Sequence, residues 1–247
     1  IFIGGVRRIA WVTEKIVPIM ALLYTVGCLF ILVMNLPGVV TAFRQIFVMA
    51  FAPQSVVGGA AGITVQKAMR FGVARGLFSN EAGMGSTPHA HALANVAHPT
   101  DQGVLAMMGV FIDTFIILTM TALVILSTGS LESGLTGSAL AQTAFNSTFG
   151  SFGNVFIAIC MFFFAFTTII GWYFFGEVNV KALFGKGAVK IYSVLAIIFI
   201  MIGSTLKVDL VWNMSDMFNG LMVLPNLLGL LPSIGVVIAL SKESGKL

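Results

Sequence analysis

The fold is decided by one stretch of sequence, Arg75-Gly76-Leu77-Phe78-Ser79-Asn80-Glu81-Ala82-Gly83-Met84-Gly85-Ser86-Thr87-Pro88. A continuous helix disfavours this composition, because an interior glycine costs about 1 kcal/mol and an interior proline about 3 kcal/mol relative to alanine. Where a membrane helix unwinds instead, its free N–H and C=O groups line a cavity or are buried in protein. Such groups can hold ions and zwitterions near the bilayer midplane. The stretch therefore predicts a broken membrane helix that forms half of a binding site.

The composition is that of an integral membrane protein. Of the 247 residues, 58% are hydrophobic and 9% are charged, and the mean hydropathy is +1.02; soluble domains have about 25% charged residues. The net charge of +4 comes from basic residues near the ends of helices, which is not a nucleic-acid-binding pattern. The two cysteines, Cys28 and Cys160, lie within apolar segments and are expected to be small core residues.

Six apolar segments reach or approach the length of a membrane span, so an all-α integral membrane fold is predicted. The predicted spans are residues 16–34, 63–95, 103–126, 153–176, 192–206 and 208–240. Pro18 is expected in the first turn of the first span, where proline is tolerated. The second span contains the central stretch. The sixth is expected to be one irregular element, with a break near Asn219-Gly220 or Pro225 as the alternative.

The remaining segments connect or precede these spans. An amphipathic piece at 40–51 is expected to lie at the membrane interface or to re-enter partway, and residues 127–150 are expected to be polar and partly helical. Residues 1–8 resemble the end of a preceding helix, so the chain, residues 1–247, is expected to be a single transmembrane transporter domain that is truncated at its N-terminus.

The distribution of lysine and arginine predicts the orientation, because cytoplasmic connections carry an excess of both. If the N-terminal end is cytoplasmic and the six spans alternate, eight basic residues lie inside and two outside. The inside set is Arg7, Arg8, Lys15, Lys181, Lys186, Lys190, Lys242 and Lys246, and the outside set is Arg44 and Lys207. A multi-pass protein of the plasma (inner) membrane is predicted, with its N-terminal end and C-terminal tail cytoplasmic.

The central stretch has groups that suit both an ion and an amino acid. Backbone carbonyls and the side chains of Ser79 and Asn80 are hard oxygen ligands for a small cation, and a half-helix N-terminus suits a carboxylate. Phe78 can wall an amino-acid side chain. Glu81 is an intramembrane acid, which is costly without a role. The alternative is a glycine-rich packing kink that binds no ligand.

Two further groups of polar residues lie inside predicted spans. The hydroxyls of Thr167 and Thr168 can ligate a cation, or they can bond back to their own helix. Trp172, taken alone, is more typical of an interface anchor. Asp113 requires a partner; the candidates are Lys67, Arg70 and Arg75, and a structural buried pair is favoured over a proton relay.

The histidines and the last span give weaker signals. On a helix, His89 and His91 would point about 200° apart, which is poor geometry for a shared metal ion. Asp216 and Asn219 lie three residues apart on one face, as expected for polar packing or a cavity wall. The sequence has no GxSxG, HExxH, phosphate-loop or CxxC motif, so an enzyme is not expected.

Seven segments together resemble the alanine or glycine:cation symporter family. They are GLFSNEAGMGSTP (76–88), GVFIDT (109–114), TMTA (119–122), GLTG (134–137), IIGWYFFGE (169–177), DLVW (209–212) and NGLM (219–222). The resemblance implies a LeuT-like fold of two inverted five-helix repeats, of which this chain covers about core helices five to ten after the end of a preceding helix. The central stretch is then the broken sixth core helix.

The resemblance also implies residue roles. Thr167 and Thr168, on the eighth core helix, would supply hydroxyls to a sodium ion, and Trp172 would become a pocket residue. The expected substrate-binding residues are Phe78, Ser79, Asn80, Gly83 and Trp172, whereas Glu81 and Asp113 are expected to have structural or gating roles. No metal other than sodium is expected.

The implied activity is uptake of alanine or glycine with sodium by alternating access. Sodium is the co-transported ion, no cofactor is expected, and the partners are the small neutral amino acid, sodium and the lipid bilayer, with no nucleic acid. Because the broken first core helix is absent from the sequence, this chain alone is not expected to transport. The alternatives are a proton-coupled transporter of the same fold that uses Glu81 or Asp113, an intramembrane metalloenzyme that uses the histidines, and a passive channel.

Overall fold

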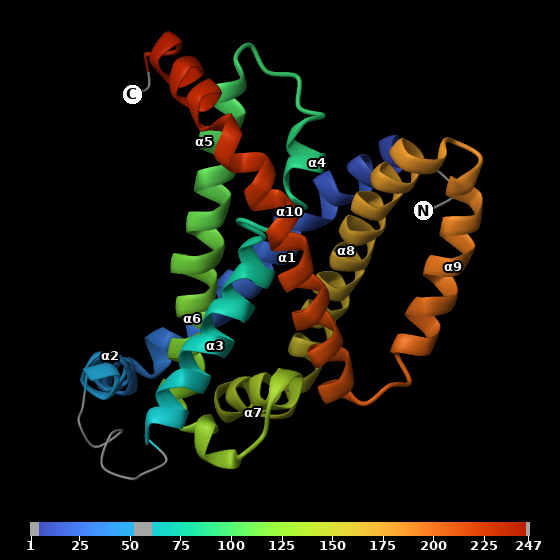
Figure 1. Ribbon diagram of the computed structural model, residues 1–247. Helices are drawn as coiled ribbons and strands as arrows, with labels where there is room; N and C mark the ends of the chain where they lie inside the picture. Colours follow the sequence, from blue (N-terminus) through green and yellow to red (C-terminus); the bar gives the residue numbers. More distant parts are fainter. Residues whose placement is uncertain (1–4, 52–60, 246–247) are drawn as a thin grey trace. The chain divides into compact units, whose positions relative to one another are not determined.

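The computed structural model describes residues 5–51 and 61–245, and throughout this part of the chain the regular structure is helical, as predicted (Figure 1). The elements are α1 (Gly5–Met34), α2 (Leu36–Phe51), α3 (Ala61–Asn80), α4 (Pro88–His91), α5 (Pro99–Phe111), a π-helical segment η3 (Ile112–Ile117), α6 (Leu118–Ser127), a 3-10 turn η4 (Ser130–Ser133), α7 (Gly137–Phe149), α8 (Ser151–Phe184), α9 (Ala188–Gly203) and α10 (Val208–Glu243).

Four helices among the described residues are long and apolar enough to cross a membrane: Trp11–Met34, Pro99–Ser127, Ser151–Phe184 and Val208–Glu243. They correspond to the first, third, fourth and sixth predicted spans. The fifth, α9, has 16 residues, which is about 24 Å of helix against a hydrocarbon core of about 30 Å. The second, α3, contains Arg70 and Arg75. A multi-pass membrane protein is therefore confirmed, whereas six crossings stay a prediction.

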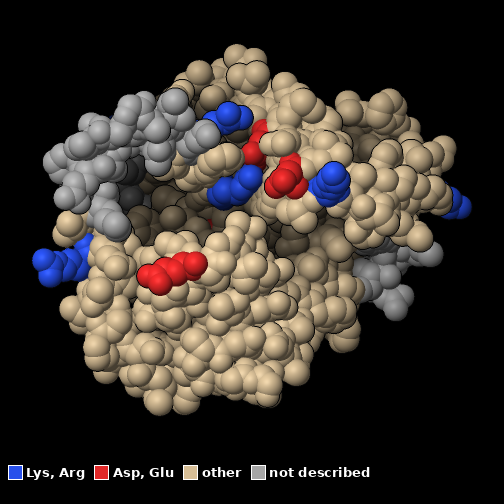
Figure 2. All heavy atoms as spheres, turned by 90° about the horizontal axis from the view of Figure 1, so that it is seen from below, with Lys and Arg blue, Asp and Glu red and all other residues tan. Residues whose placement is uncertain are grey.

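The surface fits a lipid environment. Large apolar side chains point outward on each of the four long helices, for example Leu22, Phe115, Phe162 and Leu228. Figure 2 shows one face of the molecule, on which acidic and basic side chains are few and most of the described surface is formed by other residues. In water such a surface would be costly, but in a bilayer it contacts the lipid tails.

The structure corrects the start of the chain. α1 begins at Gly5 and runs without interruption to Met34, so no separate preceding helix ends within residues 5–8; residues 1–4 lie outside the described part. Pro18 lies inside this helix, and not in a first turn. The apolar residues on both sides of Pro18 continue the helix, although proline removes the hydrogen bond to the carbonyl of Glu14.

Other boundaries follow the sequence more closely. α10 is one helix from Val208 to Glu243 with Pro225 and Pro232 inside it, as the prediction of a single element requires, and no break occurs at Asn219-Gly220. α2 contains the amphipathic piece predicted at 40–51, and α7 is the helix expected within 127–150. Residues 52–60 of the first connection lie outside the described part.

The chain divides into two compact units, and the first consists of Ile1–Lys67 with Phe115–Phe174. Its core is a cluster from α1, α6, α7 and α8. The fully buried members include Cys28, Ile31, Val124, Ala144, Phe145, Ile157 and Cys160. Both cysteines are free and buried, as predicted. α1 approaches α8 closely at Gly27, where an added Cβ would lie 2.4 Å from the Phe156 ring.

The second unit consists of Ala68–Thr114 with Phe175–Leu247. It contains most of α3, the stretch that follows it, α4, α5, α9 and α10, and α5 contacts α10 (Figure 1). Two of its most buried side chains, Met84 and Ser86, are each 1% exposed and lie outside any helix. This unit therefore packs around the central stretch of the sequence.

Candidate functional site

The predicted break in the helix is confirmed. α3 ends at Asn80, residues 81–87 form an irregular loop, and the single turn of α4 follows. Gly83 and Gly85 have φ angles of 94° and 83°, and Glu81 has a φ of 55°. Backbone of this kind is accessible to glycine but costs other residues about 1–2 kcal/mol. We call residues 81–87 the loop below.

The second half of the predicted span is not a helix. The predicted span 63–95 does not continue as a long helix after the break, because only Pro88–His91 form a helical turn. Proline favours the first turn of a helix, which places the start of α4 at Pro88 and the start of α5 at Pro99. His98 caps α5 by accepting a hydrogen bond from the Thr100 N–H. Residues 92–98 between the two helices are not helical.

Glu81 holds the loop in its conformation. Its Oε2 accepts hydrogen bonds from Ser86 Oγ at 2.8 Å and from Thr87 Oγ1 at 3.1 Å. Charge-assisted hydrogen bonds are stronger than neutral ones, so they offset the unfavourable φ of Glu81. The end of α3 also leaves the carbonyls of its last turn without partners in the helix. These oxygens are available to a ligand or to other groups of the protein.

α10 fixes the other side of the loop. Asn226 Nδ2 donates a hydrogen bond to the Gly83 carbonyl at 2.8 Å, and an added Cβ on Gly85 would lie 3.0 Å from Asn226 Oδ1. Sequence reasoning missed Asn226. The signal was present, however, because Asp216, Asn219 and Asn226 are separated by three and seven residues, which places them on one face of a helix.

A polar recess joins the end of α3 to the π-helical segment η3. Ser79 Oγ donates to Asp113 Oδ2 at 2.7 Å, and Asn80 Nδ2 donates to Thr114 Oγ1 at 3.2 Å. Asn80 Oδ1 accepts the N–H of Ala82 at 3.0 Å. π-Helical turns are rare and frequently occur at functional sites. A cavity of about 220 Å³ lies here; its polar lining is Ser79, Asn80, Glu81, Thr87, His91 and Asp113.

Neither Arg70 nor Arg75, the two predicted partners whose side chains the structure describes, pairs with Asp113. Its carboxylate accepts from Ser79, whereas Arg75, one of the three candidates, pairs with Asp216 of α10. Arg75 comes before Ser79 in α3, and its long side chain reaches Asp216 and Trp212 of α10. The side chain of Lys67 lies outside the described part.

A larger cavity borders the same loop. Its volume is about 840 Å³, and it is lined by residues of the loop, of α5 and of α10, including Asn80, Gly83, Gly85, Gln102 and Asn226. Ligand sites in proteins typically measure about 300–1,000 Å³ and combine an apolar lining with a few polar groups. The loop is therefore exposed to a space of the right size for a small molecule.

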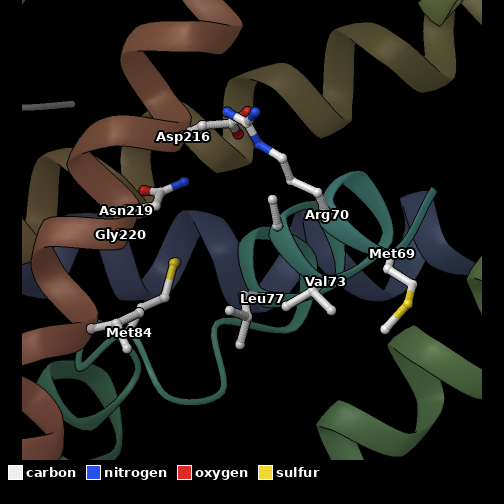
Figure 3. Close-up of a pocket in the computed structure, with 10 residues that line it drawn as sticks. Met69, Arg70, Val73, Leu77, Met84, Asp216, Asn219 and Gly220 are labelled. Atoms are coloured by element: carbon white, nitrogen blue, oxygen red, sulfur yellow. The ribbon is translucent and has the colours of Figure 1, made fainter. Parts of the chain in front are cut away.

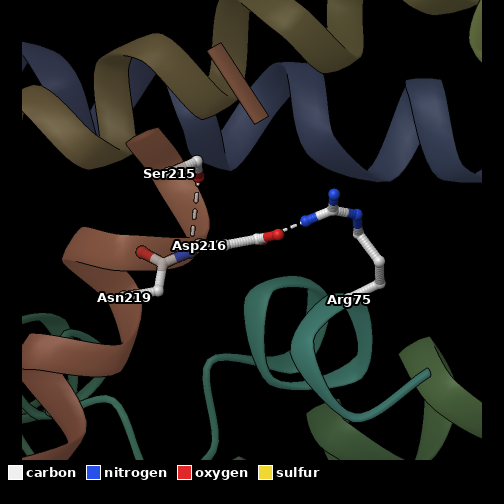
Figure 4. Close-up of polar contacts among 4 residues, drawn as sticks. All are labelled: Arg75, Ser215, Asp216 and Asn219. Atoms are coloured by element: carbon white, nitrogen blue, oxygen red, sulfur yellow. Dashed lines mark hydrogen bonds and ion pairs between the residues drawn. The ribbon is translucent and has the colours of Figure 1, made fainter. Parts of the chain in front are cut away.

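Phe78 and Arg75 attach α3 to one stretch of α10. The Phe78 ring meets Trp212 edge to face, with 5.7 Å between the ring centroids. The Arg75 guanidinium pairs with Asp216 (Figure 4). It also lies over the Trp212 ring, 3.9 Å from its centroid. The expectation that Phe78 walls an amino-acid side chain stays a prediction, since the contact that the structure gives it is with Trp212.

The hydroxyl pair and the remaining predicted pocket residue belong to the other unit. Thr167 is buried and donates back to Phe163 O at 2.9 Å, as the back-bonding alternative proposed; it also contacts Met20 Sδ at 3.6 Å. Thr168 is exposed, and Trp172 lies one turn further along α8. Because the two units are described separately, a sodium site that combines these residues with the loop stays a prediction.

The histidines make hydrogen bonds around the loop. His89 Nδ1 lies 2.9 Å from the Ser86 carbonyl and Nε2 lies 3.2 Å from Asn179 Nδ2. His91 contacts Gln102, and His98 contacts Thr100. Over the described residues, 5–51 and 61–245, no three His, Cys, Asp or Glu side chains gather as metal ligands would. The metalloenzyme alternative thus gains no support from these positions.

The long apolar helices, with a broken helix whose polar loop borders two cavities, define a multi-pass membrane transporter. The chain belongs to the sodium:alanine symporter family, whose family model matches residues 1–244. The family resemblance drawn from the seven segments is therefore confirmed, and the family consists of transporters and not of enzymes.

Curated relatives agree with this membership. An uncharacterized transporter of Haemophilus influenzae is 42% identical over 98% of this chain and 54% of its own length. The sodium/alanine symporter AgcS of Methanococcus maripaludis is 37% identical over 98% of this chain and 53% of its own length. The amino-acid carrier protein AlsT of Bacillus subtilis is 40% identical over 92% of this chain and 48% of its own length. The chain spans about half the length of the curated relatives it matches.

Proposed function

We propose that the protein takes up alanine or glycine together with sodium by alternating access. The observation that carries this proposal is the break of α3 at Asn80 into a polar loop that borders cavities of about 840 and 220 Å³. Broken helices of this kind hold substrates and ions at the midplane of secondary transporters. Membership of the sodium:alanine symporter family supports the choice of ion and substrate.

The substrate is held at the loop. Free backbone groups at the end of α3, the side chains of Ser79 and Asn80, and the backbone at Gly83 bind the carboxylate and ammonium of the amino acid. Phe78 and Trp172 limit the volume that its side chain can occupy. A small pocket of this kind selects alanine or glycine, because each additional methylene that does not fit is penalised by about 1–3 kcal/mol.

The sodium ion is held by the hydroxyls of Thr167 and Thr168 on α8. This assignment follows from a LeuT-like fold of inverted repeats, in which α3 with the loop is the broken sixth core helix and α8 is the eighth. Sodium binding lowers the free energy of closing around the zwitterion, which is a coupling between two sites. The protein lies in the plasma (inner) membrane with the N-terminal end and the C-terminal tail of this chain cytoplasmic, as the basic residues predict.

Glu81 and Asp113 have structural or gating roles in this mechanism. Each carboxylate accepts hydrogen bonds from hydroxyls of its own unit, Glu81 from Ser86 and Thr87 and Asp113 from Ser79. These bonds hold the loop and the end of α3. A change in the loop on binding substrate is therefore transmitted to both acids.

Proton coupling is the second candidate. Glu81 and Asp113 line the same recess of about 220 Å³, and intramembrane carboxylates are common proton carriers. A relative from Bacillus, 36% identical over 92% of this chain, is named a sodium/proton-dependent alanine carrier protein. In this version a proton on one of these acids replaces or accompanies sodium.

Uptake of radiolabelled alanine and glycine into vesicles containing the full-length protein tests both candidates. Uptake driven by an inward sodium gradient, and lost in Thr168→Val and in Asn80→Ala, is the expected result. Thr143→Val and Asn154→Ala change the same residue types away from the site and should retain uptake. Uptake that ignores sodium and follows a pH gradient would favour proton coupling, and no uptake of any small amino acid would contradict the proposal.

A further inference from the structure

A third cavity, in addition to the two described above, lies between α3 and α10 within the second unit. Figure 3 shows the residues that line it. The volume of the cavity is about 400 Å³. Most of the lining is apolar and comes from Met69, Val73, Ala74, Leu77, Met84 and Val223. Three polar side chains, Arg70, Asp216 and Asn219, complete it. The residues assigned above to the substrate, from Phe78 to Gly83, are not part of this lining.

The two charged groups of this cavity have opposite sign and sit on opposite walls. Arg70 comes from α3 and Asp216 from α10, and Figure 3 shows the Arg70 side chain extended towards Asp216. Among the described residues, Arg70 has neither a hydrogen-bond nor an ion-pair partner. Asp216 binds Arg75 through Oδ1, which leaves Oδ2 for a second donor. The guanidinium of Arg70 therefore faces the carboxylate of Asp216, one oxygen of which is unpaired, across a largely apolar cavity.

We infer that the cavity is a second amino-acid site, distinct from the loop, for a small zwitterion with an apolar side chain. Its carboxylate binds the guanidinium fork of Arg70, whose geometry suits two parallel hydrogen bonds to a carboxylate. Its ammonium binds Asp216, and its side chain lies against Val73 and Leu77. The inference rests on the proposed function, because the ligand is of the class that the protein is proposed to transport.

The charge pattern selects this class over other small molecules. The carboxylate of a fatty acid would pair with Arg70 but would be repelled by Asp216. An organic cation would pair with Asp216 but would be repelled by Arg70. A neutral apolar molecule would pair with neither the guanidinium of Arg70 nor the second carboxylate oxygen of Asp216, so it would gain nothing from the two charged groups of the lining. A zwitterion can pair its carboxylate with Arg70 and its ammonium with Asp216 at the same time. The volume lies within the usual range for small-molecule sites.

The position of this site allows it to communicate with the loop. Met84 is a loop residue, is 1% exposed and lines the cavity, and Leu77 lies in the last turn of α3. A ligand here contacts the helix that ends at the loop and the helix that holds Gly83. Occupancy of one site is thus expected to change the affinity of the other through shared elements.

Equilibrium binding of radiolabelled alanine, with glycine as a second probe, to the purified full-length protein tests the inference by stoichiometry. The wild type should bind two molecules per chain. Val73→Trp fills the cavity and Arg70→Gln removes its cation; each should leave one molecule bound, or weaken the second site at least tenfold. Val73→Ala and Arg44→Gln are the matched controls and should still bind two.

The outcomes separate this inference from the proposed function. Asn80→Ala should remove the loop site and leave the molecule held by Arg70 and Asp216. One molecule bound by the wild type, with sodium-driven uptake intact, would overturn the second site and leave the symporter proposal standing. Two molecules bound by both Val73→Trp and Arg70→Gln would also overturn it. Absence of amino-acid binding and of uptake in the wild type would contradict the proposed function itself.

Discussion

Arg75 of α3 pairs with Asp216 of α10, and its guanidinium lies over the ring of Trp212, with 3.9 Å between Cζ and the ring centroid. The two charged side chains are 33% and 20% exposed. They are therefore shielded more than a surface ion pair, although water still reaches them. Trp212 is one turn before Asp216, so a single arginine contacts two successive turns of α10 and attaches the end of α3 to it.

Loss of Arg75 is expected to destabilise the second unit. Arg75→Ala removes the ion pair and the cation–π contact, and it should destabilise the protein by about 1–3 kcal/mol. Arg75→Lys keeps the charge but loses the planar stacking, so its effect should be smaller. Thermal unfolding of the purified protein, in a double-mutant cycle with Asp216→Asn, measures the coupling. Arg70→Ala, five residues earlier in α3 and without a hydrogen-bond or ion-pair partner among the described residues, is the control; an equal loss there would contradict the assignment.

The glycines of the loop are expected to differ in their tolerance of a methyl group. Gly83→Ala should cost about 1–2 kcal/mol because of its positive φ, since the nearest atom to an added Cβ is 3.9 Å away. Gly85→Ala should cost more, because its Cβ would press on Asn226 at 3.0 Å and displace the hydrogen bond to Gly83. The melting temperatures of the two variants measure which substitution destabilises the protein more; Gly85→Ala is expected to melt at the lower temperature.

Gly72→Ala serves as the control for these substitutions. Gly72 is in the helical part of α3 and nothing lies within 4 Å of an added Cβ, so this change should stabilise the protein by about 0.5–1 kcal/mol. If the two loop variants melted as high as Gly72→Ala, the loop would not have the backbone conformation described above.

Asp113 separates the two coupling mechanisms. Asn at this position can still accept the hydrogen bond from Ser79, but it cannot titrate. With a structural role, Asp113→Asn should retain sodium-driven uptake at a reduced rate, whereas Asp113→Ala should reduce it further. The measurement is the initial rate of alanine uptake under a sodium gradient and, separately, under a pH gradient. Uptake that follows pH in the wild type and loses that dependence in Asp113→Asn would assign the coupling proton to this residue.

The sequence was sufficient to predict the break in the helix after α3, but it did not predict the hydrogen bonds that hold the loop in place. Glycines 83 and 85 and Glu81 in an apolar segment make a continuous helix unfavourable, and that local argument predicted where α3 ends. The hydrogen bond from Asn226 to Gly83 joins residues 143 positions apart, and no local pattern specifies such a pair. The same limit explains why Arg75 was among the three candidate partners of Asp113, although it pairs with Asp216.

Helix lengths were predictable only where apolar residues dominated. α10 stays a single helix because its apolar residues continue on both sides of Pro225, and the same effect carries α1 through Pro18. The π-helical segment around Asp113 depends on how the chain packs, and composition does not reveal it. α4 is a single turn, and a separate helix begins at the second proline, Pro99; the broken-helix argument did not consider this second helix start.

Thr168 and Thr167 are expected to contribute unequally to sodium binding. Thr167 is buried, donates to Phe163 O at 2.9 Å and contacts Met20, so its hydroxyl is already oriented by the protein. Thr168 is exposed and has its oxygen free to turn towards an ion. Thr168→Val should raise the sodium concentration for half-maximal uptake at least tenfold, because valine has the same shape but no oxygen. Thr168→Ser, which keeps the hydroxyl, should stay close to the wild type.

Thr167→Val separates a ligand role from a packing role at the neighbouring position. If Thr167 only back-bonds to its helix, the valine variant should alter thermal stability by less than about 1 kcal/mol and leave sodium dependence unchanged. If its oxygen also ligates the ion, the sodium concentration for half-maximal uptake should rise as it does in Thr168→Val. An unchanged sodium dependence in both valine variants would contradict a cation site on α8. The recess between Ser79 and Asp113 would then be the alternative site, because carboxylate, amide and hydroxyl oxygens line it.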